Sequence, residues 1–433
     1  MKLDRALALL LLFTSLGCTP RSDQSPPAAP EPTTEESADQ GGTTPQFGLP
    51  DLSPQAPPED APVPSPKPGG SPPPPPVVPE MDAEGGSAAE ESGDLSPPPE
   101  PMTTGERASI SPTKEREVDV FFATDRLPTQ SEDPNAAYGK KRNRAGPLEY
   151  GTLRVSIPPN HRMGLVERPR WYRLEFSEDP KKHVMIRDLS VLPKNQYFEL
   201  LSATSKDEAL LFIHGFNVSF AEGARRTAQI VFDLDFPGTP LYYSWPSQGA
   251  IESYTVDEDN AEWAIPHLAS FLLDVQEKTE FQRIHVIAHS MGARLLSYAL
   301  AHAKGEGFDL DLNHVILAAP DIDADVFQEQ ILPKIGDMAE RLTMYASSGD
   351  TALQVSQRLN GNDRLGLSGS DSLRVFPGMD TVDASEVNTS LIGHAYYGEH
   401  TEVMGDILAL VIRGLDPIGR DLVKGDLGEW QFP

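Results

Sequence analysis

The stretch that decides the fold reads Ile284-His285-Val286-Ile287-Ala288-His289-Ser290-Met291-Gly292. Its first four residues form an apolar run typical of a buried strand, and residues 293–303 continue with a helical pattern. A serine between small residues at a strand-to-helix junction indicates a nucleophile elbow, a turn so tight that bulky neighbours would clash. Such a turn lifts the hydroxyl of Ser290 clear of the sheet. It also leaves backbone N–H groups of the new helix unpaired beside that hydroxyl, where they can stabilise an oxyanion.

Strands and helices alternate around this stretch. We expect strands at 118–123, 150–157, 171–176, 209–213, 239–243, 284–287, 315–318, 342–345 and 373–376. We expect helices at 220–234, 261–275, 293–303, 325–332 and 401–412, and an exposed basic loop at 140–144. Short apolar strands separated by helices predict a mostly parallel sheet covered by helices on both faces. Antiparallel first strands followed by parallel ones are the order of an α/β-hydrolase fold.

A second glycine turn supplies a candidate oxyanion donor. Ile213-His214-Gly215-Phe216 ends the first parallel strand, and glycine there allows close backbone approach to the reaction centre. We therefore predict that the backbone N–H groups of Phe216 and Met291 form the oxyanion hole. For His214 we favour a structural role, as a core residue that hydrogen-bonds this loop, over proton transfer.

The acid that would orient a catalytic histidine should follow a later strand. Asp350 lies just past the strand expected at 342–345, where ligand-facing residues of such sheets lie, and it is our candidate. Asp323, after the preceding strand, is the alternative. Helix capping is the competing explanation for Asp321 and Asp323, because aspartate accepts from free N–H groups at a helix start.

The candidate base is His394, which follows the last expected strand within Gly393-His394-Ala395-Tyr396-Tyr397. His400 is the alternative, but its acidic neighbours are typical of an exposed helix start. A histidine is needed because a serine hydroxyl is a poor nucleophile until a base takes its proton. In chain order, Ser290, Asp350 and His394 follow the α/β-hydrolase arrangement.

The chain resembles the bacterial α/β-hydrolases of unknown function that often occur as envelope lipoproteins. The resemblance covers about residues 117–412 and rests on Val120–Arg126, Phe212–Asn217, Tyr243–Ser247, the Ser290 elbow, Ala318–Asp323 and Gly393–Tyr397. It implies the fold and an esterase-like or lipase-like activity, but no particular substrate. For Thr124-Asp125-Arg126 we prefer a structural role over a place in the wall of the site.

The N-terminus has the features of a lipoprotein signal peptide. Residues 6–16 are apolar, follow Lys2 and Arg5, and are too short to span a bilayer as a permanent helix. We expect residues 1–17 to be removed and Cys18, the one cysteine of the chain, to carry the membrane anchor. An ordinary signal peptide that contains a cysteine is the alternative. Thr19, rather than Asp, after the cysteine favours the outer membrane of a Gram-negative envelope.

Composition separates a linker from the catalytic body. Residues 19–112 hold 25 of the 42 prolines and 16 acidic against 3 basic residues. Their apolar residues are too sparse to offset the entropy of ordering. We therefore predict a disordered acidic linker at 18–113 and an α/β-hydrolase domain at 114–433. The net charge of −29 makes nucleic acid an unsuitable partner, and no metal-ligand spacing or cofactor motif appears.

Two function classes remain. The first is a membrane-tethered serine hydrolase that cleaves small-molecule or lipid esters through Ser290, Asp350 and His394, without a cofactor. The second is a catalytically inactive α/β-hydrolase fold that binds a ligand in the cell envelope. The three candidate residues in the correct order favour the enzyme.

Overall fold

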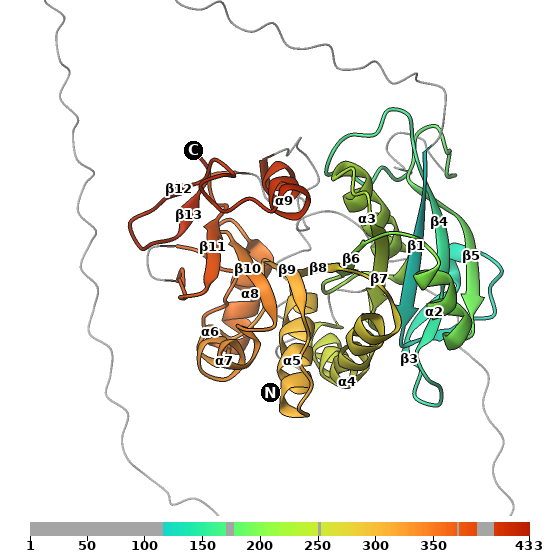
Figure 1. The fold of residues 1–433 in the computed structure, drawn as a ribbon, viewed down its shortest axis with the longest axis horizontal. Helices are drawn as coiled ribbons and strands as arrows, with labels where there is room; N and C mark the ends of the chain where they lie inside the picture. Colours follow the sequence, from blue (N-terminus) through green and yellow to red (C-terminus); the bar gives the residue numbers. More distant parts are fainter. Residues whose placement is uncertain (1–115, 170–176, 250–252, 370–371, 388–401) are drawn as a thin grey trace, which may run out of the picture. The chain divides into compact units, whose positions relative to one another are not determined.

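The centre of the molecule is a twisted sheet of 11 strands (Figure 1). The computed structural model describes residues 116–169, 177–249, 253–369, 372–387 and 402–433. In spatial order the strands are β12 (Val423–Lys424), β13 (Trp430–Gln431), β11 (Met379–Asp383), β10 (Ala339–Ala346), β9 (Leu312–Ala318), β8 (Arg283–His289), β6 (Glu208–Ile213), β7 (Thr239–Ser244), β1 (Arg116–Thr124), β4 (Glu149–Ile157) and β5 (Met185–Leu192).

Most neighbouring strands run parallel. The pairs from β1 through β7, β6, β8, β9 and β10 to β11 are all parallel. The exception on the N-terminal side is β4, which runs antiparallel to both β1 and β5. The structure thus confirms a mostly parallel sheet with antiparallel strands near its start.

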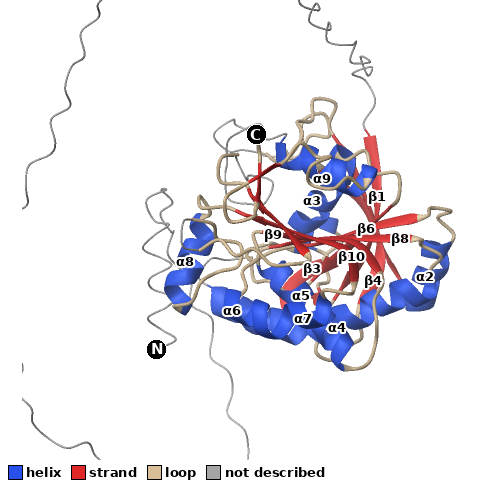
Figure 2. Ribbon diagram, turned by 60° about the vertical axis from the view of Figure 1, so that its left-hand side comes forward, coloured by secondary structure: helices blue, strands red, loops and turns tan. Residues whose placement is uncertain are grey.

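Helices cover both faces of the sheet (Figure 2). One face packs against α3 (Phe220–Asp233) and α9 (Glu402–Arg413). The other face packs against α2 (Lys194–Ser202), α4 (Tyr254–Lys278), α5 (Met291–Gly305) and the continuous stretch α6 (Ala324–Val326), η4 (Phe327–Ile331) and α7 (Leu332–Ile335). Among the described helices, none combines the length and apolar character needed to cross a membrane.

The order of the strands reverses at β6, and this reversal positions the site. The chain passes from β6 to β7 on one side of it and later to β8 on the other. Ile213 at the end of β6 lies opposite Ala288 in β8, so the loops after these two strands emerge side by side. Ligands of open α/β sheets bind at such reversal points, outside the carboxyl ends of the strands.

Two expectations are wrong, and several elements were not predicted. The strand expected at 373–376 is loop, and the observed strand β11 follows it; Phe376 is buried there and packs on Phe327. The apolar run therefore reflects a core contact made from a loop. The basic loop expected at 140–144 is partly a strand, because β3 (Tyr138–Arg142) pairs with β2 (Arg126–Pro128) in a small separate sheet. The elements β5, α2, α8 (Thr351–Asn360) and the 3-10 turn η1 (Pro134–Ala136) were not predicted from the sequence.

Candidate active site

Ser290 occupies a strained turn between β8 and α5. Its φ is 52° and its ψ is −121°, a backbone conformation that residues other than glycine rarely adopt. Its amide donates to the Ala318 carbonyl at 2.9 Å, which ties the turn to the end of β9. Only 9% of the residue is exposed. Strain of this kind persists only where the surrounding structure enforces it, and it is typical of functional sites.

Two glycines allow the turn to approach the loop after β6. A Cβ atom on Gly292 would lie 2.3 Å from the His214 carbonyl oxygen, and one on Gly215 would lie 3.0 Å from the Ser290 Cβ. The first separation is too short for any side chain, and the second would force its neighbours to shift. The small residues around Ser290 are therefore required by direct backbone contact between the elbow and its neighbouring loop.

The two expected oxyanion donors lie on this pair of loops. Met291 is the first residue of α5, and the first four N–H groups of a helix have no acceptor within it. Phe216 directly follows Gly215, which lies against Ser290. The ring of Phe216 meets that of Tyr254 edge to face, with 5.3 Å between the centroids.

His214 and Arg126 support the loops and lie in the interior. His214 stacks on Trp245, and its Nδ1 lies 2.8 Å from the Gly215 carbonyl oxygen. Burial, reinforced by the charge of Arg126, lowers the pKa of His214 to about 3. Arg126 donates to the carbonyl oxygens of Val218 (2.8 Å) and Ser247 (2.9 Å). Both side chains therefore have the structural role that the sequence analysis favours.

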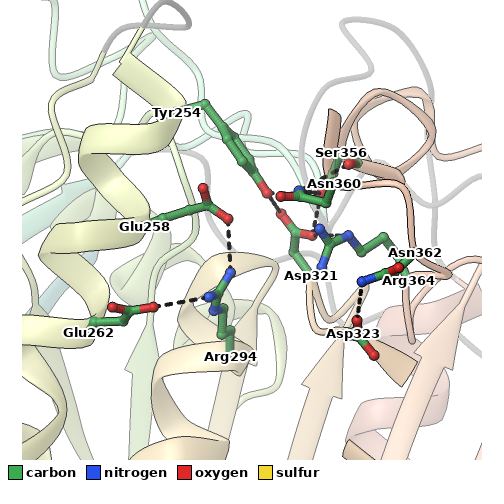
Figure 3. Close-up of polar contacts among 10 residues, drawn as sticks. All are labelled: Tyr254, Glu258, Glu262, Arg294, Asp321, Asp323, Ser356, Asn360, Asn362 and Arg364. Atoms are coloured by element: carbon green, nitrogen blue, oxygen red, sulfur yellow. Dashed lines mark hydrogen bonds and ion pairs between the residues drawn. The ribbon is translucent and has the colours of Figure 1, made fainter. Parts of the chain in front are cut away.

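A buried carboxylate, Asp321, joins three segments around the elbow (Figure 3). It accepts hydrogen bonds from the Tyr254 hydroxyl and the Ser356 hydroxyl, each at 2.6 Å, and lies 3.4 Å from Nε of Arg364. Its amide lies 3.3 Å from the Ser290 carbonyl oxygen, to which it donates. Burial and the charge of Asp321 raise the pKa of Tyr254 well above 10.0, so the phenol stays protonated and donates.

A separate ion-pair network joins α4 to α5. Arg294, one turn after Ser290, lies 3.0 Å from Glu258 and 3.3 Å from Glu262 of α4 (Figure 3). Burial raises the pKa of Glu258, and Arg294 opposes that rise. The helix that follows Ser290 is thus held to the helix that carries Tyr254.

The candidate acids are both helix caps. Asp323 accepts from the amides of Asp325 and Val326 at 3.0 Å each, as the capping explanation predicts. Asp350 accepts from the Leu353 amide at 2.9 Å and begins α8. Asp321 is not a cap, contrary to that explanation, because its carboxylate binds side chains of other segments. The sequence analysis missed its role, which depends on residues far apart in the chain.

His394, His400 and Cys18 lie outside the described residues, as does the strand expected at 171–176. The pairing of His394 with Ser290 and Asp350 therefore stays a prediction. Among the residues that the structure does describe, no group of three or more His, Cys, Asp or Glu side chains could hold a metal ion.

Comparison with known proteins identifies a family. A family model described as "Alpha/beta hydrolase of unknown function (DUF900)" matches residues 193–413, just over half of the chain. An uncharacterized protein of Nostoc sp. is 33% identical over 75 residues, which are 17% of this chain and 20% of that protein. The chain thus aligns with about a fifth of that relative's length.

Solved structures give weaker similarities. An uncharacterized protein from Bacillus cereus is 18% identical, with a TM-score of 0.30, over 48% of this chain and 60% of that chain. A fungal esterase from Rhizomucor miehei is 9% identical, with a TM-score of 0.30, over 69% of this chain and 84% of that chain.

Proposed function

The chain belongs to this family of α/β-hydrolases of unknown function, and we propose that it is a serine hydrolase that cleaves carboxylic esters through Ser290. The observation that carries the proposal is the strained backbone of Ser290, at a φ of 52° between β8 and α5. A turn of this kind has a cost in stability, and nucleophilic catalysis is the recurrent reason for it at the strand-order reversal of an α/β-hydrolase fold.

The reaction would follow from these positions. The Ser290 hydroxyl attacks the ester carbonyl while His394 accepts its proton, and the tetrahedral oxyanion accepts hydrogen bonds from the Met291 and Phe216 amides. Collapse of the intermediate expels the alcohol, which takes the proton from His394. Water then attacks the acyl-enzyme, again with His394 as base, and the Ser290 oxygen takes that proton back as the carboxylic acid leaves.

Asp350 would orient His394 and stabilise its charged form. Its position after β10 supports this role, since the carboxyl end of a parallel strand faces the site. The roles of both residues rest on the sequence, because His394 lies outside the described residues.

The cellular setting is a proposal from the sequence. The apolar run that ends in Gly17-Cys18 supports a lipid anchor on Cys18 in the cell envelope, and in a Gram-negative cell the outer membrane is favoured over the inner one. Esters of lipids or of small molecules that reach this surface are the substrates that we propose.

Release of p-nitrophenol from a series of p-nitrophenyl esters tests the activity. We expect wild-type protein to hydrolyse the short esters and Ser290→Ala to fall to the background rate with little change in thermal midpoint. Ser297→Ala is the matched control. Ser297 lies two turns further along α5, and its hydroxyl merely donates to the Ala293 carbonyl at 2.8 Å.

Full turnover by Ser290→Ala would exclude Ser290 as the nucleophile. A folded wild-type protein that hydrolyses no ester of the series would instead support an inactive hydrolase fold that binds a ligand.

A further inference from the structure

A groove lies beside the edge strand β5 and its neighbour β4. This open groove of about 560 Å³ runs between the start of β4, the junction of β5 with α2, and the middle of α4. Its walls are mostly apolar and include Leu148, Tyr150, Val191 and Pro266. Val191 leaves 56% of its surface exposed. The volume falls within the range of small-molecule sites, about 300–1,000 Å³.

One wall of the groove holds a histidine whose ring is oriented by a buried carboxylate. His267 of α4 lines the groove, and its Nδ1 lies 3.1 Å from Oδ2 of Asp125. The Asp125 side chain is only 3% exposed, whereas the imidazole is 34% exposed. Because a carboxylate accepts, the ring donates Nδ1–H to Asp125, which leaves Nε2 to hydrogen-bond a ligand in the groove.

Asp125 is buried, unlike the carboxylate of an ordinary surface ion pair. Its Oδ2 accepts from both His267 and the Tyr243 hydroxyl (3.0 Å), while Oδ1 has no hydrogen-bond partner in the described structure. Burial raises the pKa of Asp125, and the hydrogen bond from His267 opposes that rise. A buried carboxylate with a bare oxygen is costly, and a carboxylate that fixes a histidine beside a cleft is typical of a functional site.

The remaining polar groups of the groove define the polarity of its ligand. Lys194 pairs with Asp274, with 2.5 Å between Nζ and Oδ2, and the same carboxylate also contacts Lys278. Glu149 accepts from the Tyr138 hydroxyl at 2.9 Å. Ser270 lies three residues after His267, on the same face of α4, and also lines the groove. Glu149 disfavours an anionic ligand, whereas a hydroxyl could hydrogen-bond Nε2 of His267 and accept from Ser270.

We propose that this groove binds an amphiphilic alcohol, a molecule with an apolar chain or ring and one hydroxyl group. The hydroxyl hydrogen-bonds Nε2 of His267, and the apolar part lies along Leu148, Val191 and Pro266. The site is independent of Ser290 and of the ester hydrolysis proposed above.

Titration of the full chain with 1-octanol, followed by calorimetry and by tryptophan emission, tests the proposal. The ring of Trp263 lies 4.4 Å from that of His267, so occupancy should change its emission. We expect saturable binding that His267→Ala weakens about fivefold, the effect of one neutral hydrogen bond. Ser270→Trp should abolish binding by filling the groove, and Ser270 is exposed, so the fold should tolerate the change.

Ser290→Ala is the control and should bind 1-octanol as the wild type does. Absence of saturable binding to the wild type, or unchanged affinity in both groove variants, would overturn the site. Tighter binding of octanoate than of 1-octanol would overturn the assignment of a neutral hydroxyl. Since no hydrolysis is measured, these outcomes do not depend on the proposed activity.

Discussion

The absence of a Cβ atom on Gly292 allows the close contact between the elbow and the loop after β6. A methyl group on Gly292 would lie 2.3 Å from one backbone oxygen and 2.8 Å from another, and backbone cannot rotate away as a side chain can. We predict that Gly292→Ala displaces the loop after β6, lowers the free energy of unfolding by about 1–3 kcal/mol and reduces ester turnover. Chemical denaturation and p-nitrophenyl ester kinetics measure the two effects.

The control for this change lies at the other end of the same helix. A Cβ on Gly305 would meet nothing within 4 Å, so Gly305→Ala should leave both quantities near their wild-type values. Equal activity in the two alanine variants would show that close contact between the loops is not needed.

The two capping aspartates allow a sharp test of the triad acid. Asparagine caps a helix as well as aspartate does, so Asp350→Asn and Asp323→Asn should each keep the thermal midpoint. If Asp350 orients His394, Asp350→Asn lowers kcat by about ten-thousandfold, while Asp323→Asn is mild. The reverse pattern would place the acid after β9.

At the scale of elements, a buried histidine fastens the segment after β4 to α3. His161 lies 2.9 Å from Glu167 through Nδ1 and 2.8 Å from Asp233, the last residue of α3, through Nε2. Burial opposes the charge of His161, but the hydrogen bonds from the ring to Asp233 and Glu167 outweigh it and raise the pKa to about 9. Arg226 also lies in this region and donates to the Gly164 carbonyl.

The raised pKa predicts how stability depends on pH. Protonation of His161 favours the folded state, so its contribution is complete below pH 6.5 and is lost as pH rises through about 9. We expect the free energy of unfolding of the wild type to exceed that of His161→Asn by on the order of 3 kcal/mol more at pH 6 than at pH 10. Urea titrations at both pH values measure this. A difference that is constant with pH would contradict the charged histidine.

Local sequence predicts the elements whose apolar residues are buried on both sides. β6, β7, β8 and β9 agree with the expectation because fully buried strands are continuous apolar runs. β5 was missed because it is largely exposed at the edge of the large sheet, where few apolar residues are needed. Within the site, the Ser290 elbow was predictable from its small neighbours. The partners of Asp321 and of Asp125 were not, because Tyr254 and His267 join them only through the tertiary fold.

At the scale of the whole molecule, the candidate chemistry belongs to one part of the chain. Every residue proposed for ester cleavage or for the groove lies after residue 113. Residues 18–113 supply none of them. We therefore predict that a chain beginning near Pro112 keeps the kcat and KM of the full chain on soluble short esters. Steady-state kinetics on both proteins measure this, and loss of folding or activity in the shortened chain would refute the division into linker and catalytic domain.

The central claim is that Ser290 is an activated nucleophile, and reaction with a fluorophosphonate probe tests it most directly. The wild type and Ser297→Ala should each gain one probe mass, located by peptide mass spectrometry on Ser290, and Ser290→Ala should gain none. Folded wild-type protein that stays unlabelled, or that carries the probe on another residue, would contradict the account.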